Sequence, residues 1–421
     1  MKKLQVLLLL FPLGLSLCAQ KKIDKDIESI QSKVIEWRRY FHQHPELSNR
    51  EFKTAEKIAE HLNNLGMQVQ TGVAKTGVVG ILHGKRPGKV IALRADIDAL
   101  PVTERVDLPF KSTVVTEFDG VTTGVMHACG HDTHIAILMG VAEVLSKNND
   151  FSGTIKFIFQ PAEEGAPKGE EGGAELMVKE GVLKNPDVEA IFGLHIGSYL
   201  EVGKIRYKPG GTMAAAQRFD IKVTGKQAHG SSPWTGVDPI MVSAKIIDGL
   251  QSIISREMEL TNEAAVITVG KITSGVRNNI IPETAEMVGT IRTLDYSMQE
   301  KLNKRMKEMV PAIAKAYNAQ ASITIENGLP ITFNDPDLTA KVLPSLEKAA
   351  GKENVLLGKA VTGAEDFSFF QKEIPGFYFF LGGKPVDKEA TLHHTPDFYI
   401  DESGLLLGVK TFTQIVFDYL K

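Results

Sequence analysis

Short β-rich runs alternate with helical segments along the first half of the chain, and this alternation constrains the fold more than any other feature. In the helical segments, apolar residues recur every three to four positions. Alternating strands and helices favour the α/β class, with a mixed, mostly parallel sheet flanked by helices. We expect strands at residues 67–70, 77–83, 89–94, 154–159 and 190–194, and helices at residues 23–41, 51–65, 132–147 and 172–180.

The pattern changes at about Gly211. Strand-like runs at 216–223, 266–272, 285–293 and 322–325 enclose helical segments at 238–256 and 298–316. This βαββαβ order predicts a four-stranded antiparallel sheet with both helices on one face. The α/β alternation then resumes, with a helix at 337–350, a strand at 376–381 and a closing helix at 403–419. We therefore expect one domain in two parts, residues 23–210 and 328–421, interrupted by a smaller inserted domain at 211–327.

Polar side chains follow three of the expected strands. Asp96 follows the first, Glu163 and Glu164 follow the second, and His195 follows the third. Ligands of open α/β sheets bind at the carboxyl ends of the strands, so we expect these residues to lie together. Two adjacent carboxylates can share the work, one binding a metal and the other taking a proton from metal-bound water. A solvated acidic loop is the structural alternative for the glutamates.

A second concentration of reactive side chains lies at residues 124–134, which contain His127, Cys129, His131 and His134. Imidazole and thiolate are preferred ligands of zinc and its neighbours, and residues two apart on an extended chain project to the same side. We expect Asp132 to cap the helix that follows, and the helix N-terminus to favour the thiolate form of Cys129. A chance cluster beside a buried cysteine is the alternative.

The N-terminus has the layout of a signal peptide, with lysines at 2 and 3 and an apolar run at 7–17. We predict a signal peptide at 1–19, cleaved after Ala19, and an exported protein, periplasmic or secreted. A lipid anchor on Cys18 is the alternative. Cys129 is then the remaining cysteine, which excludes an intrachain disulfide. A net charge of −3 and the lack of long basic runs argue against a nucleic-acid partner, and no later run has the ~20 apolar residues of a membrane span.

From about residue 30 onward, the chain resembles the dinuclear metallohydrolases that include aminoacylase and the glutamate carboxypeptidases. It is most similar to their N-acyl-amino-acid amidohydrolase branch, which includes hippurate hydrolase and the auxin-conjugate hydrolases. The resemblance rests on residues 93–101 (Leu-Arg-Ala-Asp-Ile-Asp-Ala-Leu-Pro), 127–132 (His-Ala-Cys-Gly-His-Asp), 160–165 (Gln-Pro-Ala-Glu-Glu-Gly), 193–195 (Gly-Leu-His), 228–233 (Ala-His-Gly-Ser-Ser-Pro), 363–367 (Gly-Ala-Glu-Asp-Phe) and 394–396 (His-Thr-Pro).

The resemblance implies two divalent metal ions, which zinc, manganese, cobalt or nickel would satisfy. Their implied ligands are Cys129, His131, Glu164, His195 and His394, with Glu163 as general base. Many members of the wider family place a metal-binding histidine where this chain has Arg94. An arginine is no ligand, so Cys129 supplies the missing donor and Asp96 orients a ligand instead. His393 competes with His394, and Pro396 aligns better with His394.

The inserted domain resembles the lid, or dimerisation domain, of this family. By that resemblance, His229 hydrogen-bonds the oxyanion that forms when the amide carbonyl is attacked. Asn279 and Arg292 grip the free carboxylate of the substrate, a task that suits a guanidinium group. Taken alone, His229 is compatible with a surface histidine and Arg292 with a buried salt bridge. A homodimer through the lid, by residues 238–256 and an exposed sheet edge, is expected by analogy.

The expected function is a metal-dependent amidohydrolase that cleaves N-acyl-amino acids or small peptides next to a free carboxylate, with metal-activated water and Glu163 as general base. Two alternatives are a metallo-carboxypeptidase or dipeptidase on the same site, and a non-catalytic binding module. A third is a thiol hydrolase with Cys129 as nucleophile and His131 as base, although it leaves Glu164, His195 and His394 unexplained. A Cys/His zinc deaminase is disfavoured because no Pro-Cys-x-x-Cys follows.

Overall fold

The computed structural model describes residues 21–421, which form two compact units. Unit 1 comprises the described residues up to Pro209 together with Asn334–Gly358 and Phe369–Lys421, and unit 2 comprises Gly210–Phe333 and Lys359–Ser368. The predicted signal peptide at 1–19 and its alternative anchor lie outside the described residues. Within residues 21–421, every helix is too short or too polar to traverse a lipid bilayer.

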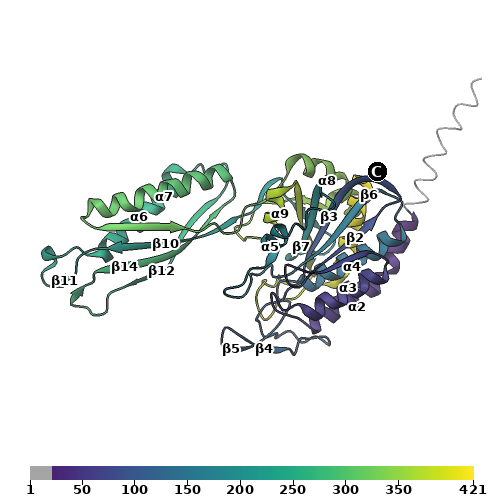
Figure 1. Ribbon diagram of the computed structural model, residues 1–421, viewed down its shortest axis with the longest axis horizontal. Helices are drawn as coiled ribbons and strands as arrows, with labels where there is room; N and C mark the ends of the chain where they lie inside the picture. Colours follow the sequence, from purple (N-terminus) through teal and green to yellow (C-terminus); the bar gives the residue numbers. More distant parts are fainter. Residues whose placement is uncertain (1–20) are drawn as a thin grey trace, which may run out of the picture. The chain divides into compact units, whose positions relative to one another are not determined.

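Unit 1 is built on an eight-stranded mixed sheet with the strand order β1-β2-β6-β3-β7-β18-β8-β17. The central strands run parallel, since β3 pairs with β6 on one side and β7 on the other, and β7 pairs with β18. The predicted α/β class with a mostly parallel sheet is confirmed (Figure 1). The strands are β1 Gln68–Val73, β2 Gly77–His83, β3 Arg86–Asp96, β6 Ser152–Gln160, β7 Ala190–Glu201, β8 Ile205–Tyr207, β17 Val355–Leu357 and β18 Gly376–Lys384.

Helix α4 is the central helix of unit 1, and its residues are buried from His131 to Leu145. It packs on β3, β6 and β7, and α2, α3 and α10 contact it. Because α4 is covered by strands and by other helices, it needs no polar stripe facing solvent. The helices of the unit are α2 Gln31–Gln43, α3 Phe52–Asn64, α4 His131–Lys147, α5 Gly173–Lys179, α8 Pro336–Ala350, α9 Ser368–Glu373 and α10 Leu405–Tyr419.

Unit 2 has the predicted βαββαβ order, formed by β10 Ala215–Thr224, α6 Pro239–Glu257, β12 Ala265–Ser274, β14 Thr284–Thr293, α7 Tyr296–Ala316 and β15 Gln320–Ile325. The strands form an antiparallel sheet in the order β12-β14-β10-β15. Alternate residues of β10 are buried, as a half-covered strand requires. Both helices lie on the same face of this sheet (Figure 1) and share one apolar core with it. This part of the fold prediction is also confirmed.

Two details of the expected secondary structure are wrong. Helix α4 begins at His131 with Gly130 at its N-cap, so Asp132 lies in the first turn and does not cap the helix. Gly130 has φ +93, and a Cβ atom there would lie 2.4 Å from Cγ2 of Ile196, so glycine is required. Strand β7 does not end before His195 but continues to Glu201, because it pairs with β18 along that length.

Several short elements have no counterpart among the expected ones. They are the hairpin β4 Val115–Phe118 and β5 Val121–Gly124, the pair β9 Gly210–Met213 and β16 Thr332–Asn334, the pair β11 Ala228–His229 and β13 Ile280–Ile281, and the edge strands β8 and β17. Strands of two to four residues carry too few positions for an alternating pattern to be recognised.

Candidate metal centre and catalytic site

Three neighbouring parallel strands bring the predicted residues of unit 1 together. Asp96, the last residue of β3, pairs with Gln160, the last residue of β6. The register between β3 and β7 places His195 level with Asp96 on the other side. Glu163 and Glu164 lie in the loop that directly follows β6. The site therefore lies at the carboxyl edge of the parallel strands, where ligands of α/β sheets bind.

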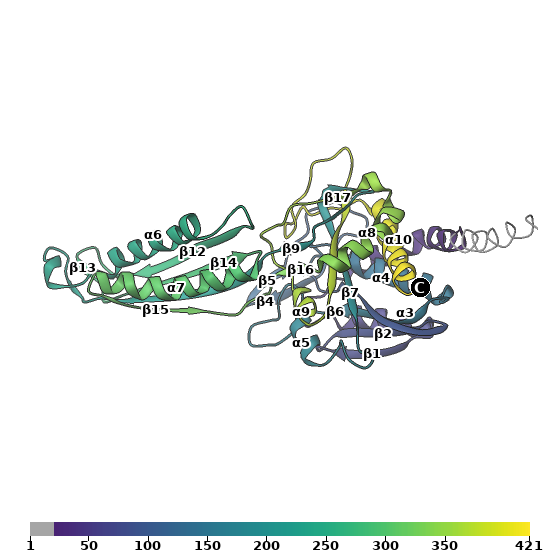
Figure 2. The same cartoon turned by 90° about the horizontal axis from the view of Figure 1, so that it is seen from above.

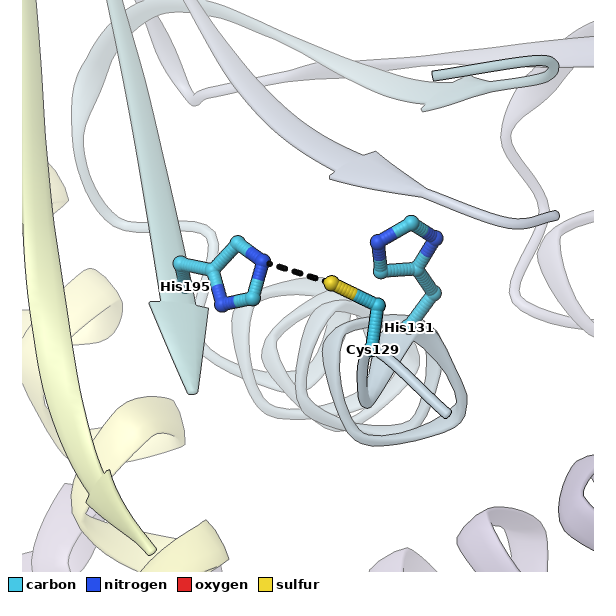
Figure 3. Close-up of side chains that lie close together, drawn as sticks. All are labelled: Cys129, His131 and His195. Carbon is cyan, nitrogen blue, oxygen red and sulfur yellow. Dashed lines mark hydrogen bonds between the residues drawn. The ribbon is translucent and has the colours of Figure 1, made fainter. Parts of the chain in front are cut away.

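The thiol of Cys129 lies between two imidazole rings (Figure 3). Its Sγ atom is 3.4 Å from Nε2 of His195, and one donor atom each of Cys129, His131 and His195 lies within 4.8 Å of the others. Burial and the carboxylates of Glu164 and Glu163 raise the pKa of the Cys129 thiol well above its ordinary value. Burial and these carboxylates thus outweigh the helix N-terminus that was expected to favour the thiolate.

His131 and His195 each donate a hydrogen bond from Nδ1–H to a backbone carbonyl oxygen. Nδ1 of His131 lies 2.9 Å from the carbonyl oxygen of Asp98, and Nδ1 of His195 lies 2.8 Å from that of Ile196. A ring that donates through Nδ1 presents the lone pair of Nε2, which is how metal-binding histidines are usually fixed. Nε2 of His131 is buried without a hydrogen-bond partner and lies 3.8 Å from Glu163 and 3.9 Å from Glu164.

His394 completes a second group of donors. Its Nε2 lies 3.3 Å from Sγ of Cys129 and 3.1 Å from Oε1 of Glu164. His393 is placed differently, because its Nε2 accepts a hydrogen bond from the backbone N–H of Ser198 at 3.3 Å. Its Nδ1 lies 3.7 Å from the same sulfur. Only His394 of the two contacts both Cys129 and Glu164 among the described residues, which favours His394 as the ligand.

These donors fit a pair of divalent ions. Two groups of three, Cys129 with His131 and His195, and Cys129 with Glu164 and His394, share the thiol. Nitrogen and sulfur donors with one carboxylate suit zinc and neighbouring transition metals. His131 Nε2 also fits, because its buried lone pair has no hydrogen-bond partner and would gain one from a bound cation.

Asp96 forms a further possible donor group with His131 and His134, but both of its oxygens are already engaged. Its carboxylate contacts Nη1 of Arg94 at 2.6 Å and Nδ1 of His134 at 2.5 Å. Burial alone would raise the pKa of Asp96, but His131, His134 and Arg94 outweigh it and hold the pKa well below its ordinary range. Nε2 of His134 accepts from the N–H of Ile196 at 2.8 Å, so both of its nitrogens are used. This supports an orienting role for Asp96.

His127 does not reach the donor groups. It is buried, neither ring nitrogen has a hydrogen-bond partner among the described residues, and burial lowers its pKa to about 4. Asp132, expected to be a helix cap, instead pairs with Arg38 at 2.8 Å and with His42 at 2.9 Å. His42 is buried within this charged network.

Two buried carboxylates near the site were missed by the sequence reading. Asp98 accepts from the N–H of Glu164 at 3.0 Å and from Oγ of Ser48 at 2.7 Å. Glu51 accepts from the N–H of Ala162 at 2.9 Å. Asp98 lies in the motif that contains Asp96, which was a usable signal. The sequence carries no such signal for Glu51, because a glutamate before an amphipathic helix is ordinarily a surface residue.

The predicted residues of the inserted domain lie at two ends of unit 2. His229 of β11 pairs with Ile280 of β13, and the N–H of Gly230 bonds the carbonyl oxygen of Asn279 at 2.8 Å. This pair lies at one end of unit 2, beyond the Thr284 end of β14 (Figure 2). Arg292 lies at the other end of β14, opposite Ala216. At about 3.3 Å per residue, Arg292 lies roughly 26 Å from the Thr284 end of β14.

Comparisons with known proteins agree with this geometry. Residues 92–418 match the model of peptidase family M20/M25/M40. Thermostable carboxypeptidase 2 of Saccharolobus solfataricus is 42% identical over 92% of this chain and 95% of its own length. An N-acetyl-L-cysteine deacetylase of Bacillus subtilis is 37% identical over 90% of this chain and 86% of its own length. The crystal structure of a dinuclear metal-binding M20 peptidase from Bacillus subtilis has a TM-score of 0.79 and 35% identity, covering 93% of this chain and 99% of that one.

Proposed function

The chain belongs to peptidase family M20/M25/M40 and is a metal-dependent hydrolase of amide bonds, and we propose that its substrates are N-acyl-amino acids with a free carboxylate. The resemblance to the N-acyl-amino-acid amidohydrolase branch is confirmed, and divalent metal ions are its cofactors. The observation that carries the proposal is the donor set around Cys129, with Glu163 3.8 Å from a histidine of that set.

Glu163 is the general base of the proposed reaction. Divalent metals held by the donor set would supply activation of the attacking water and polarisation of the scissile carbonyl. Glu163 takes a proton from the attacking water and returns it to the leaving amine nitrogen, a role that contributes roughly 10²- to 10⁴-fold to the rate. Glu164, His131, His195, Cys129 and His394 hold the metals in this proposal.

The lid residues supply substrate recognition. Arg292 and Asn279 grip the free carboxylate, a task that the forked guanidinium suits, while His229 donates a hydrogen bond to the oxyanion. Because His229 and Arg292 are separated by the length of β14, a single lid cannot bring both to one small molecule. The site is therefore completed by His229 and Asn279 of a second copy of the chain, which makes the protein a homodimer.

Two surfaces of unit 2 support this homodimer. Strand β12 is at the edge of its sheet and exposes Val266 and Ile272, so it is open to pairing with another strand. Helix α6 exposes Ile240 and Met241 near its start. Both lie within the region in which the sequence predicts the dimer contact.

The alternative mechanism, a thiol hydrolase with Cys129 as nucleophile, has less support than the metal-dependent one. Among the described residues, the Cys129 sulfur has hydrogen-bond contacts with Glu164, His195, His393 and His394 but none with the proposed base His131. A thiol whose pKa is raised by burial and by neighbouring carboxylates is also a poor nucleophile. A carboxypeptidase remains the second candidate, because a relative of that name shares 42% identity with this chain.

The experiment is a hydrolysis screen with metal-free protein and with protein reloaded with zinc, manganese, cobalt or nickel. The panel contains N-acetyl-amino acids, N-benzoylglycine and dipeptides, each as the free acid and as the C-terminal amide. We expect metal-dependent hydrolysis of N-acyl free acids and little hydrolysis of the amides. Preferred cleavage of the peptides would favour the carboxypeptidase, and binding without hydrolysis would favour the binding module.

A further inference from the structure

The two backbone N–H groups that flank Glu163 are each held by a buried carboxylate. The N–H of Ala162 donates to Oε1 of Glu51 at 2.9 Å, and the N–H of Glu164 donates to Oδ2 of Asp98 at 3.0 Å. Both carboxylates are buried, with exposed fractions of 0% for Glu51 and 1% for Asp98. Hydrogen bonds to buried carboxylates thus fix the backbone on both sides of the general base.

Glu51 differs from Asp98 in what else it contacts. Asp98 also contacts Nδ1 of His131, a proposed metal ligand. The second oxygen of Glu51 accepts from Oγ1 of Thr76 at 2.6 Å, and Glu51 has no described contact with any proposed ligand. Glu51 therefore contacts the loop without contacting a proposed ligand, which allows its contribution to be tested separately.

The backbone that Glu51 holds is strained. Ala162 has φ +51, in the left-handed region that residues other than glycine rarely adopt. Such a conformation persists only where the surroundings over-determine it, and it is common at functional sites. The hydrogen bond from the N–H of Ala162 to Glu51 fixes this residue from outside the loop, one position before Glu163.

The same segment of chain anchors the outer part of the loop. Nδ2 of Asn49 donates to the carbonyl oxygen of Glu171 at 3.1 Å, and Arg50 pairs with Glu170 at 2.6 Å. Ser48, at the start of the segment, donates to Asp98. Residues 48–51 thus contact the loop at several points, and Glu51 makes the contact nearest to the general base.

We propose that Glu51 is a positioning residue, whose carboxylate holds Ala162 in its left-handed turn and thereby directs Glu163 and Glu164 into the metal site. The proposal rests on the proposed function for its catalytic consequence. Burial and the nearby Asp98 raise the pKa of Glu51 to about 7, so the carboxylate is retained at a site that penalises its charge. An acceptor at the solvated surface could bond the Ala162 N–H without this cost of burying a charge.

The test compares Glu51→Ala, Glu51→Gln and Thr76→Val with Glu170→Ala as the matched control. Glu170 ties the same loop to Arg50 and Lys75 at its outer end, away from Ala162. Glutamine keeps an acceptor oxygen for the Ala162 N–H and can turn its amide toward Thr76. Two readouts are measured on the full chain: kcat and KM on an N-acyl-amino acid, and the affinity and visible spectrum of Co²⁺ bound to metal-free protein.

We expect Glu51→Ala to lower kcat about 100-fold with little change in KM, and to weaken Co²⁺ binding about 10- to 100-fold. Glu51→Gln should retain most of both properties, Thr76→Val should be intermediate, and Glu170→Ala should match the wild type. Thr76→Val keeps the test valid if Glu51→Ala does not fold. A wild-type Co²⁺ spectrum and affinity in Glu51→Ala, or Glu51→Gln no better than Glu51→Ala, would overturn the proposal. The Co²⁺ readout applies even if the wild type hydrolyses none of the substrates, so the two failures are distinguishable.

Discussion

Nε2 of His394 lies 3.3 Å from Sγ of Cys129, although the two residues are 265 positions apart in the chain. The backbone adds a second link, since the N–H of His394 donates to the carbonyl oxygen of Ala128 at 2.9 Å. The C-terminal part of unit 1 thus contributes directly to the thiol-centred donor set. This contact joins the end of the chain to the loop that starts α4.

Replacing the general base should separate catalysis from metal binding. Glu163→Gln removes the proton acceptor while keeping the shape of the side chain, so kcat should fall at least about 100-fold. The metal content, measured by elemental analysis after gel filtration, should remain that of the wild type, because the other donors are intact. Substantial activity in this variant would refute the role of Glu163.

Removing the metal should abolish activity. Removing the Cys129 thiol should abolish activity as well, because the metal is then lost. A chelator should inactivate the protein, and added divalent metal should restore it. Cys129→Ala should lose metal, because the thiol belongs to both groups of donors. In the metal-loaded protein, Cys129 should react slowly with alkylating reagents, because it is buried and coordinated. Chelator-resistant activity that alkylation abolishes would instead indicate a thiol hydrolase.

Mixing two inactive variants should recover activity if the lid serves the partner's site. His229→Ala and Glu163→Gln each inactivate a homodimer for a different reason. In a mixed dimer, the subunit that keeps Glu163 receives His229 from its partner, so one of the two sites is complete. Random exchange should give about one quarter of the wild-type activity. Activity that stays at the sum of the two variants, with subunit exchange verified by a tag, would argue against a shared site.

Glu51 should make stability depend on pH in a defined direction. Burial and Asp98, the charged group that faces it, raise its pKa from 4.5 to about 7. Between these values the folded state keeps a proton that the unfolded state has released, so the free energy of unfolding falls as the pH rises. Glutamine does not titrate, so Glu51→Gln should not show this fall in the free energy of unfolding.

Relative to the wild type, Glu51→Gln should therefore be more stable at pH 8 than at pH 5, by at most about 3 kcal/mol. Urea unfolding of the metal-free proteins at the two pH values gives this difference directly. Equal differences at both pH values would mean that the pKa of Glu51 is ordinary in the folded protein.

Much of the fold follows from local patterns. The alternation of β-rich and helical segments predicts the mixed sheet of unit 1, and the βαββαβ order predicts the sheet of unit 2 with both helices on one face. These succeed because burial of one face or stripe imposes a period of its own on each element. Asp96, Glu163 and Glu164 were expected together because parallel strands end at one edge of the sheet.

The tertiary structure decided what no local pattern encodes. The preference for His394 over His393 depends on which ring contacts both Cys129 and Glu164, a matter of packing between segments far apart in the chain. The protonation of Cys129 depends on burial and on carboxylates from another loop, which outweigh the helix N-terminus that the sequence reading relied on. Glu51 has the sequence context of a surface residue, and only its burial against Ala162 gives it a role at the site. Sequence thus determined which donors are available and which edge carries them, whereas long-range packing determined which of them meet and in which protonation state.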